Sequence, residues 1–180
     1  WRRTYLSLWR LIPEVYPLGY TLPADPRLPD HSIYDHLDIA SAMSSGEDGL
    51  ALLSVKIAGV QEFISNSRKL SDLWASSHIF SSLIFEAIKV ISEELGPDSI
   101  IYPQIRENPM FDFYLKYEFG VNVKIDVSKL KIASLPNVLL SFIPLRKAEE
   151  YSEKVASALE KRWRELSDYV KIYLQILNIK

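Results

Sequence analysis

The run LALLSVKIAG at residues 50–59 decides the fold class. Residues 50–57 are almost continuously apolar, which is typical of a β-strand buried on both faces, and Gly59 ends the run. Residues 60–95 then repeat apolar side chains three or four positions apart, and this spacing predicts a helix in two parts that stops at Gly96. A buried strand followed by a long amphipathic helix predicts a mixed α/β (α+β) domain.

Two further strands and a last helix complete the pattern. Prolines bound apolar runs at residues 99–102 and 138–143, and both runs predict short strands. The clearest helix of the chain is expected from residue 146 to 177, with one apolar and one charged face. Residues 103–137, including an aromatic-rich stretch at 110–119, are interpreted as a long connection. This order of elements predicts a ferredoxin-like, half-wound sheet whose fourth strand is not visible.

The first 46 residues have a different character. Residues 5–11 favour a helix, whereas the prolines between residues 12 and 30 favour extended or turning chain. Residues 32–43 predict a short helix that Asp30, His31 or Ser32 can cap. The polar run Ser44 to Gly49 then favours a turn, so we place a domain boundary between residues 46 and 47.

The composition excludes several classes of protein. A net charge of -2 argues against a free-standing nucleic-acid binder held by phosphate contacts. The absence of cysteine excludes disulfides and thiolate zinc sites and fits a cytoplasmic protein. Charges or prolines interrupt every window of about 18 residues, so no membrane span is expected. The chain begins at Trp1 without a signal-peptide pattern, and we expect it to be a piece of something longer.

Four segments together make the chain recognisable. They are PDHSIYDHL at residues 29–37, VQEFI at 60–64 leading through Arg68 and Lys69 to DLW at 72–74, IYP at 101–103 with Arg106, Asn108 and Pro109, and SLPN at 134–137. With this order and spacing, the chain resembles the large, polymerase-like subunit of the type III-B CRISPR effector, the Cmr complex. The resemblance implies that residues 1–46 are the C-terminal part of an HD-type helical domain and residues 47–180 a first palm domain.

The resemblance also implies a function for the complete subunit. That family works with the other Cmr subunits, CRISPR RNA and target RNA, makes cyclic oligoadenylates from ATP with divalent metal ions, and cuts single-stranded DNA. Its cyclase centre needs a Gly-Gly-Asp-Asp run and its nuclease centre an adjacent His-Asp pair, and this sequence contains neither. We therefore expect a non-catalytic palm that supports ATP binding and assembly of the complex.

A polar segment between the two halves of the long helix is the candidate nucleotide site. It contains Ser67, Arg68, Lys69, Asp72 and Ser76, and its cations suit phosphate groups. The alternative is a solvated helix face. The preceding strand ends without the carboxylate that a two-metal palm requires. Trp74, which follows Asp72, is expected to anchor the helix in the core.

His31, Asp35 and His36 form a candidate metal site. Residues four apart share one face of a helix, and imidazole and carboxylate groups suit transition metals. The alternative is that Asp30 and His31 cap the helix and that Asp35 orients a histidine or pairs with Arg27.

Arg106, Asn108 and Asp112 follow the second strand in a segment restricted by prolines. We expect these side chains to lock a loop against the domain by hydrogen bonds, with contact to guide or target RNA as the alternative. For the whole chain, the competing hypotheses are an independent ferredoxin-like RNA-binding module and a remnant of a metal-dependent HD phosphohydrolase. The usual aromatic ribonucleoprotein motif of the RNA-binding module is absent from the sequence.

Overall fold

A computed structural model describes residues 1–46 and 48–176. Its helices are α1 (Arg2–Val15), α2 (Ile33–Ser44), α3 (Val60–Ser65), α4 (Leu70–Glu94), α5 (Pro109–Phe119) and α6 (Ala148–Ile176). Its strands are β1 (Pro23–Asp25), β2 (Leu28–Ser32), β3 (Leu50–Lys56), β4 (Ile100–Tyr102) and β5 (Val138–Pro144). The mixture of helices with small antiparallel sheets confirms the α+β class.

The main sheet has three strands in the order β3-β5-β4. Strand β5 lies in the middle and pairs antiparallel with both neighbours, so β3 and β4 run in the same direction. This order agrees with the first three strands of a ferredoxin-like fold. Strands β1 and β2 form a separate antiparallel ribbon near the N-terminus.

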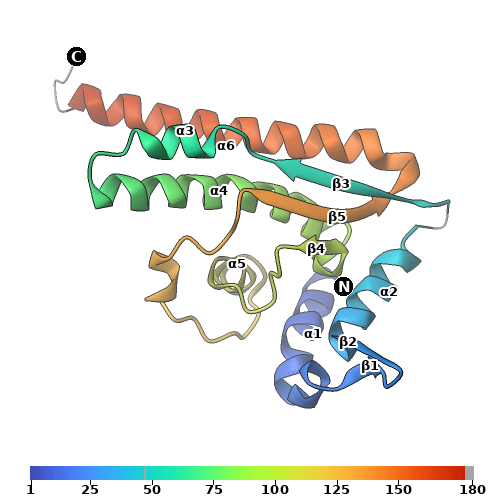
Figure 1. Ribbon diagram of the computed structural model, residues 1–180. Coiled ribbons are helices and arrows are strands. Elements are labelled where there is room, and N and C mark those ends of the chain that lie inside the picture. The colour runs from blue at the N-terminus through green and yellow to red at the C-terminus, as the bar shows by residue number, and fades with distance from the viewer. Residues whose placement is uncertain (47, 177–180) are drawn as a thin grey trace.

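Helices α3, α4 and α6 lie together along one side of this sheet (Figure 1). The two-part helix expected over residues 60–95 and the long C-terminal helix are therefore confirmed. Apolar residues of α4 and β5 meet the first two turns of α6 in one core, which includes Ile84, Ile88, Leu139, Tyr151 and Val155.

The core also contains side chains from the first 46 residues. Leu6 and Trp9 of α1 are buried against the same cluster as Phe111 and Leu115 of α5. The rings of Trp9 and Phe111 meet edge to face, with centroids 5.9 Å apart. Apolar packing thus crosses the boundary that we expect between residues 46 and 47, and that boundary stays a prediction.

The expectation that β3 is buried on both faces is wrong. The strand lies at the margin of the sheet, and the side chain of Leu52 is 58% exposed. A continuous apolar run does not distinguish a central strand from a marginal strand whose outer surface lacks a cover.

Helix α1 is longer than its sequence suggests, because it continues through Pro13 to Val15. A proline inside a helix cannot donate to the carbonyl four residues earlier, which here belongs to Trp9. The Nε of Arg106 donates to this carbonyl oxygen at 3.3 Å instead. The lost hydrogen bond is replaced by one from a distant part of the chain, and local sequence patterns do not show this.

Residues 109–119, interpreted as part of a connection, form helix α5. The side chain of Asn108 caps its first turn, Pro109 occupies the first helical position, and Gly120 ends it in the left-handed conformation with φ of 63°. These are ordinary start and stop signals of a helix. Asp112 accordingly lies in a helix and not in a loop.

Candidate functional site

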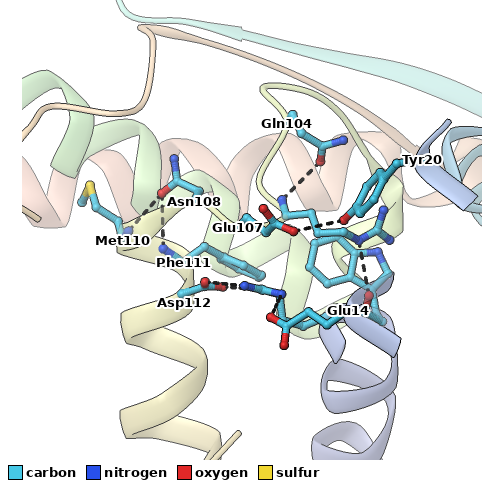
Figure 2. A network of polar contacts seen from close by, with 11 residues as sticks. Glu14, Tyr20, Gln104, Glu107, Asn108, Met110, Phe111 and Asp112 are labelled. Carbon is cyan, nitrogen blue, oxygen red and sulfur yellow. Dashed lines mark hydrogen bonds and ion pairs between the residues drawn. The ribbon is translucent and has the colours of Figure 1, made fainter. Parts of the chain in front are cut away.

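A network of polar side chains joins α1 to the start of α5 (Figure 2). The guanidinium of Arg10 donates two hydrogen bonds to the carboxylate of Asp112, at 2.7 and 2.8 Å, and a third to Glu14 at 2.7 Å. Burial by itself lowers the pKa of Arg10, but the hydrogen bonds to Asp112 outweigh it and the pKa is raised. Arg10 and Asp112 therefore form a buried, charge-balanced pair that fastens one helix to the other.

Arg106 makes a second connection to the N-terminal segment. Its Nη2 donates to Asp38 of α2 at 2.8 Å, and its guanidinium lies 4.3 Å from the ring centroid of Trp9. The indole of Trp9 also donates to Asp38, at 3.2 Å. Burial raises the pKa of Asp38, while the hydrogen bond from Arg106 acts in the opposite direction.

Asn108 performs two tasks at the start of α5. Its Oδ1 accepts hydrogen bonds from the amides of Met110 and Phe111, at 3.0 and 3.4 Å. Its Nδ2 donates to the carbonyl and hydroxyl oxygens of Ser134, at 3.3 and 3.1 Å. The first task caps the helix, and the second attaches the later SLPN segment to it.

The neighbouring Glu107 has a left-handed backbone, with φ of 63°, and its carboxylate accepts a hydrogen bond from Tyr20 at 3.4 Å. Burial, followed by the charge of Glu107, raises the pKa of Tyr20 to about 12. Arg106, Asn108 and Asp112 are only 7%, 8% and 6% exposed. Their polar atoms face the protein and leave little surface for a ligand, so the arrangement suits a structural connection.

The candidate nucleotide segment lies in the loop between α3 and α4 and in the first turns of α4. Asp72 accepts hydrogen bonds from the amides of Arg68 and Lys69, at 3.2 and 3.1 Å, and so caps α4. The buried hydroxyl of Ser76 donates to the carbonyl oxygen of Asp72 at 2.7 Å. Ser67 lies in the turn, where its amide donates to Ile64 at 2.9 Å.

Arg68 and Lys69 differ from the rest of this segment. Both are exposed, and neither forms an ion pair with any residue that the structure describes. Of the five predicted nucleotide-site residues, these two thus present charge to solvent, while Asp72 and Ser76 are engaged within the helix.

Trp74 is not a core anchor, because 53% of its surface is exposed. Its indole donates to the carbonyl oxygen of Lys131 at 2.7 Å, and its ring lies on that of His78 with centroids 4.3 Å apart. Trp74 lies on the apolar stripe of α4, as the spacing predicts, but outside the buried core.

No carboxylate stands at the end of β3, where the chain passes through Ile57 and Ala58 to Gly59. Strand β4 leads through Pro103 toward α5 and not into a tight acidic hairpin. The residues present at these two strand ends therefore do not fit a divalent metal ion.

The histidine cluster has only part of the expected geometry. The Nε2 of His31 lies 3.3 Å from the Nδ1 of His36, and the Nδ1 of His31 lies 2.5 Å from the Oδ1 of Asp30. Asp35 points to the helix terminus, where it accepts hydrogen bonds from the amide and the hydroxyl of Ser32. Ser32 and Asp35 together form a capping box for α2.

Asp35 is therefore withdrawn from the two imidazoles, and the expected alternative pairing with Arg27 is wrong because Arg27 pairs with Asp25 at 2.7 Å. Among residues 1–46 and 48–176, no group of three or more His, Cys, Asp or Glu side chains is arranged to hold a metal ion.

An aromatic groove between α4 and α5 was not expected. It has a volume of about 720 Å³ and its walls include Phe85, Met110, Phe113, Tyr114 and Tyr117. The aromatic-rich stretch at residues 110–119 was its visible signal, but only the helical conformation of that stretch brings its rings to one face.

Comparisons with known proteins identify the family. Residues 52–168 match the family model for the N-terminal part of the CRISPR-associated protein Cmr2. The chain belongs to the Cmr2 family. It is 44% identical over 134 residues to the CRISPR system Cmr subunit Cmr2 of Pyrococcus furiosus, a match that covers 74% of this chain and 14% of that protein. It is 30% identical over 196 residues to the Cmr2 subunit of Saccharolobus solfataricus, covering 86% of this chain and 19% of that protein.

A solved structure supports the same conclusion. A chain of the type III-B Cmr-beta complex, determined by cryo-electron microscopy in the apo state, superposes with a TM-score of 0.75 at 27% identity. The match covers 97% of this chain and 21% of the solved chain, so this chain spans a minor part of its relatives. The predicted resemblance to the large subunit of the type III-B CRISPR complex is confirmed. In the described residues, the helices are too short or too polar to cross a membrane.

Proposed function

We propose that the chain is a non-catalytic palm of the Cmr2 subunit, which forms one wall of an ATP site used for cyclic oligoadenylate synthesis in the cytoplasm. The observation that carries this proposal is the pairing of two features: metal-binding carboxylates are missing from the strand ends, and Arg68 and Lys69 are exposed side by side. The chain then supplies charge to a nucleotide and leaves the metal ions to another palm.

The position of the two cations supports this role. They precede the first turn of α4, where the positive end of the helix dipole adds to their charge. Since Asp72 already occupies the amides of both residues, their side chains remain the groups that can reach a ligand. Arginine and lysine are the usual partners of phosphate oxygens.

The proposal assigns no metal ion to this chain. Divalent ions in the complete site would be held by the carboxylates of a second palm, and the part of this chain is to bind and orient the phosphates. Contact with the other Cmr subunits, CRISPR RNA and target RNA belongs to the same proposal, because the chain belongs to a subunit of that complex.

Calorimetric titration of ATP into the chain, with and without a palm that carries the metal-binding carboxylates, tests the role. We expect the double variant R68A/K69A to weaken ATP binding by at least about tenfold in the presence of that second palm, as the loss of two charge-assisted contacts predicts. The matched control R164A/K171A removes one arginine and one lysine from the exposed face of α6 and should leave ATP binding unchanged. Equal, negligible heats with and without the second palm would contradict the proposal.

A further inference from the structure

The aromatic groove between α4 and α5 has no part in the ATP site that we propose. Helix α5 runs across α4 and is seen end-on in Figure 1. It buries one face, which includes Phe111, in the core, and it turns a second face with Phe113, Tyr114 and Tyr117 toward the groove. The ring of Tyr114 meets that of Phe85 from α4 edge to face, with centroids 5.7 Å apart. The groove is thus a defined surface between two packed helices.

Two aromatic rings of the groove are open to solvent. Phe113 and Tyr117 are 42% and 66% exposed, and their ring centroids lie 4.3 Å apart. Exposed apolar surface of this kind marks sites of interaction, because covering it removes it from water. Aromatic and methionine side chains are enriched at protein interfaces, and Met110 lines the same groove. These features suit a protein segment as the occupant.

The basic side chains of the groove are already engaged. Lys89 pairs with Glu86 at 2.6 Å, and Glu86 is outside the groove lining. Arg2 lies 3.9 Å from Glu93, which also accepts a hydrogen bond from the hydroxyl of Tyr114. Little positive charge is therefore left for an anionic ligand.

Glu118 is the charge of the groove that has no partner. It is exposed, and it forms no ion pair with any residue in the described parts of the chain. The Nε2 of His78 faces the carbonyl oxygen of Lys131 at 2.8 Å. Burial, the hydrogen bond to Glu93 and the charges of Glu93 and Glu118 raise the pKa of Tyr114, while the arginine of the groove opposes them as the smallest of these causes. The groove therefore attracts positive charge.

We propose that the aromatic groove binds an arginine-bearing segment of another protein chain, whose guanidinium stacks on the rings of Phe113 and Tyr117 and donates to the carboxylate of Glu118. Arginine fits these features better than lysine, because its planar guanidinium stacks on an aromatic face and still donates hydrogen bonds from its edge. Partner chains are at hand, since this chain belongs to a subunit of the Cmr complex. The proposal does not depend on the ATP role.

A strand of nucleic acid matches the groove less well. Proteins that stack bases on aromatic rings also hold the phosphates with free cations. Here Lys89 and Arg2 are engaged, and the carboxylate of Glu118 would repel a phosphate.

Calorimetric titration of the Cmr2 subunit, purified without its partner subunits, tests the chemistry of the occupant. The probes are three blocked tripeptides with leucine at both ends and arginine, its uncharged analogue citrulline, or glutamate in the middle. We expect the arginine peptide to bind about tenfold more tightly than the citrulline peptide, because it alone gains the cation–π and carboxylate contacts together. The glutamate peptide should be the weakest. Equal binding of the arginine and citrulline peptides, or no binding of either, overturns the proposal.

Two variants place this binding in the groove. Glu118→Gln should abolish most of the preference for arginine over citrulline, and Tyr117→Ala should weaken both peptides. The matched control is Glu153→Gln, which removes an exposed carboxylate from α6 and should keep the preference. A preference that survives Glu118→Gln would show that the arginine binds elsewhere and would contradict the proposal.

Photo-crosslinking in the assembled Cmr complex identifies the class of occupant. A photoreactive phenylalanine analogue in place of the exposed Tyr117 should crosslink to a segment of another subunit, and mass spectrometry should find an arginine within or beside that segment. A crosslink to RNA, a crosslink within the same polypeptide, or the absence of any crosslink overturns the proposal.

Discussion

At the scale of single residues, the pair Arg10 and Asp112 is the most sensitive connection between α1 and α5. Removing the carboxylate by Asp112→Ala leaves a buried arginine with one partner, the half-exposed Glu14. We expect the free energy of unfolding to fall by about 3–5 kcal/mol in urea titrations, because a buried charge that loses its buried partner is costly. The matched control is Glu14→Ala, which removes the exposed partner of the same arginine and should cost less than about 1 kcal/mol. Similar losses of stability in both variants would contradict the view that Asp112 is the main partner of Arg10.

Asp38 predicts a dependence of stability on pH. Burial raises its pKa above the ordinary value of 3.8, so the folded protein holds this proton more tightly than the unfolded chain. The contribution of protonated Asp38 to the free energy of unfolding is therefore complete below pH 3.8 and is lost as the pH rises through the raised pKa. The variant Asp38→Asn keeps the acceptor and never ionises, so its free energy of unfolding should rise relative to that of the wild type as the pH rises above 3.8 and through the raised pKa.

Asp126 supplies the control for this measurement. Hydrogen bonds from Ser128 lower its pKa, so the wild type gains stability from this group as the pH rises. The free energy of unfolding of Asp126→Asn should therefore fall relative to that of the wild type as the pH rises. Urea titrations at several pH values measure both differences. A difference for Asp38→Asn that does not vary with pH would contradict the raised pKa.

At the scale of elements, Asn108 holds α5 by two separable contacts. Asn108→Ala removes both the cap and the tie to Ser134, and we expect a loss of about 1–2 kcal/mol. Asn108→Asp keeps an oxygen that accepts from the amides of Met110 and Phe111 but loses the N–H groups that donate to Ser134. If the helix cap contributes most of the stability, this variant should be destabilised by less than half as much as Asn108→Ala. Thermal unfolding followed by circular dichroism measures the three proteins.

The sequence predicted those elements whose signals are local. Helices α3, α4 and α6 and strands β4 and β5 follow from apolar spacing and from the prolines and glycines beside them. Helix α5 was missed although Asn108, Pro109 and Gly120 mark its ends, because its aromatic residues and flanking prolines suggested a connection. The end of α1 was not predictable, since the hydrogen bond that the carbonyl of Trp9 loses at Pro13 is replaced by one from Arg106, far away in the sequence.

The candidate sites show the same limit. Sequence spacing identified Arg106, Asn108 and Asp112 as one set but not Arg10 and Asp38, which are their partners from the first 46 residues. In the metal candidate, the spacing placed Asp35 near the histidines but did not show that Ser32 holds its carboxylate at the helix terminus. Partners far apart in the chain depend on tertiary packing, which periodicity does not record.

At the scale of the whole molecule, the two segments separated by the expected boundary share one core, one buried ion pair and one partly buried ion pair. Leu6 and Trp9 pack against Phe111 and Leu115, and the charges of Arg106 and Asp112 are compensated by residues before position 46. A palm domain that folds alone would not place its compensating charges in another domain.

This sharing predicts the behaviour of a chain from which residues 1–46 are deleted. We expect a cooperative thermal transition for the whole chain. Residues 47–180 alone should lose it and bind a hydrophobic dye, because the apolar surface of α5 is uncovered and Asp112 loses its partner. Adding residues 1–46 as a separate peptide should restore the transition at least in part. The matched control is truncation after Ser167, which removes the exposed end of α6 and should shift the midpoint by only a few degrees. If residues 47–180 instead unfold cooperatively at the midpoint of the whole chain, the boundary between residues 46 and 47 separates two autonomous domains and the shared core is dispensable.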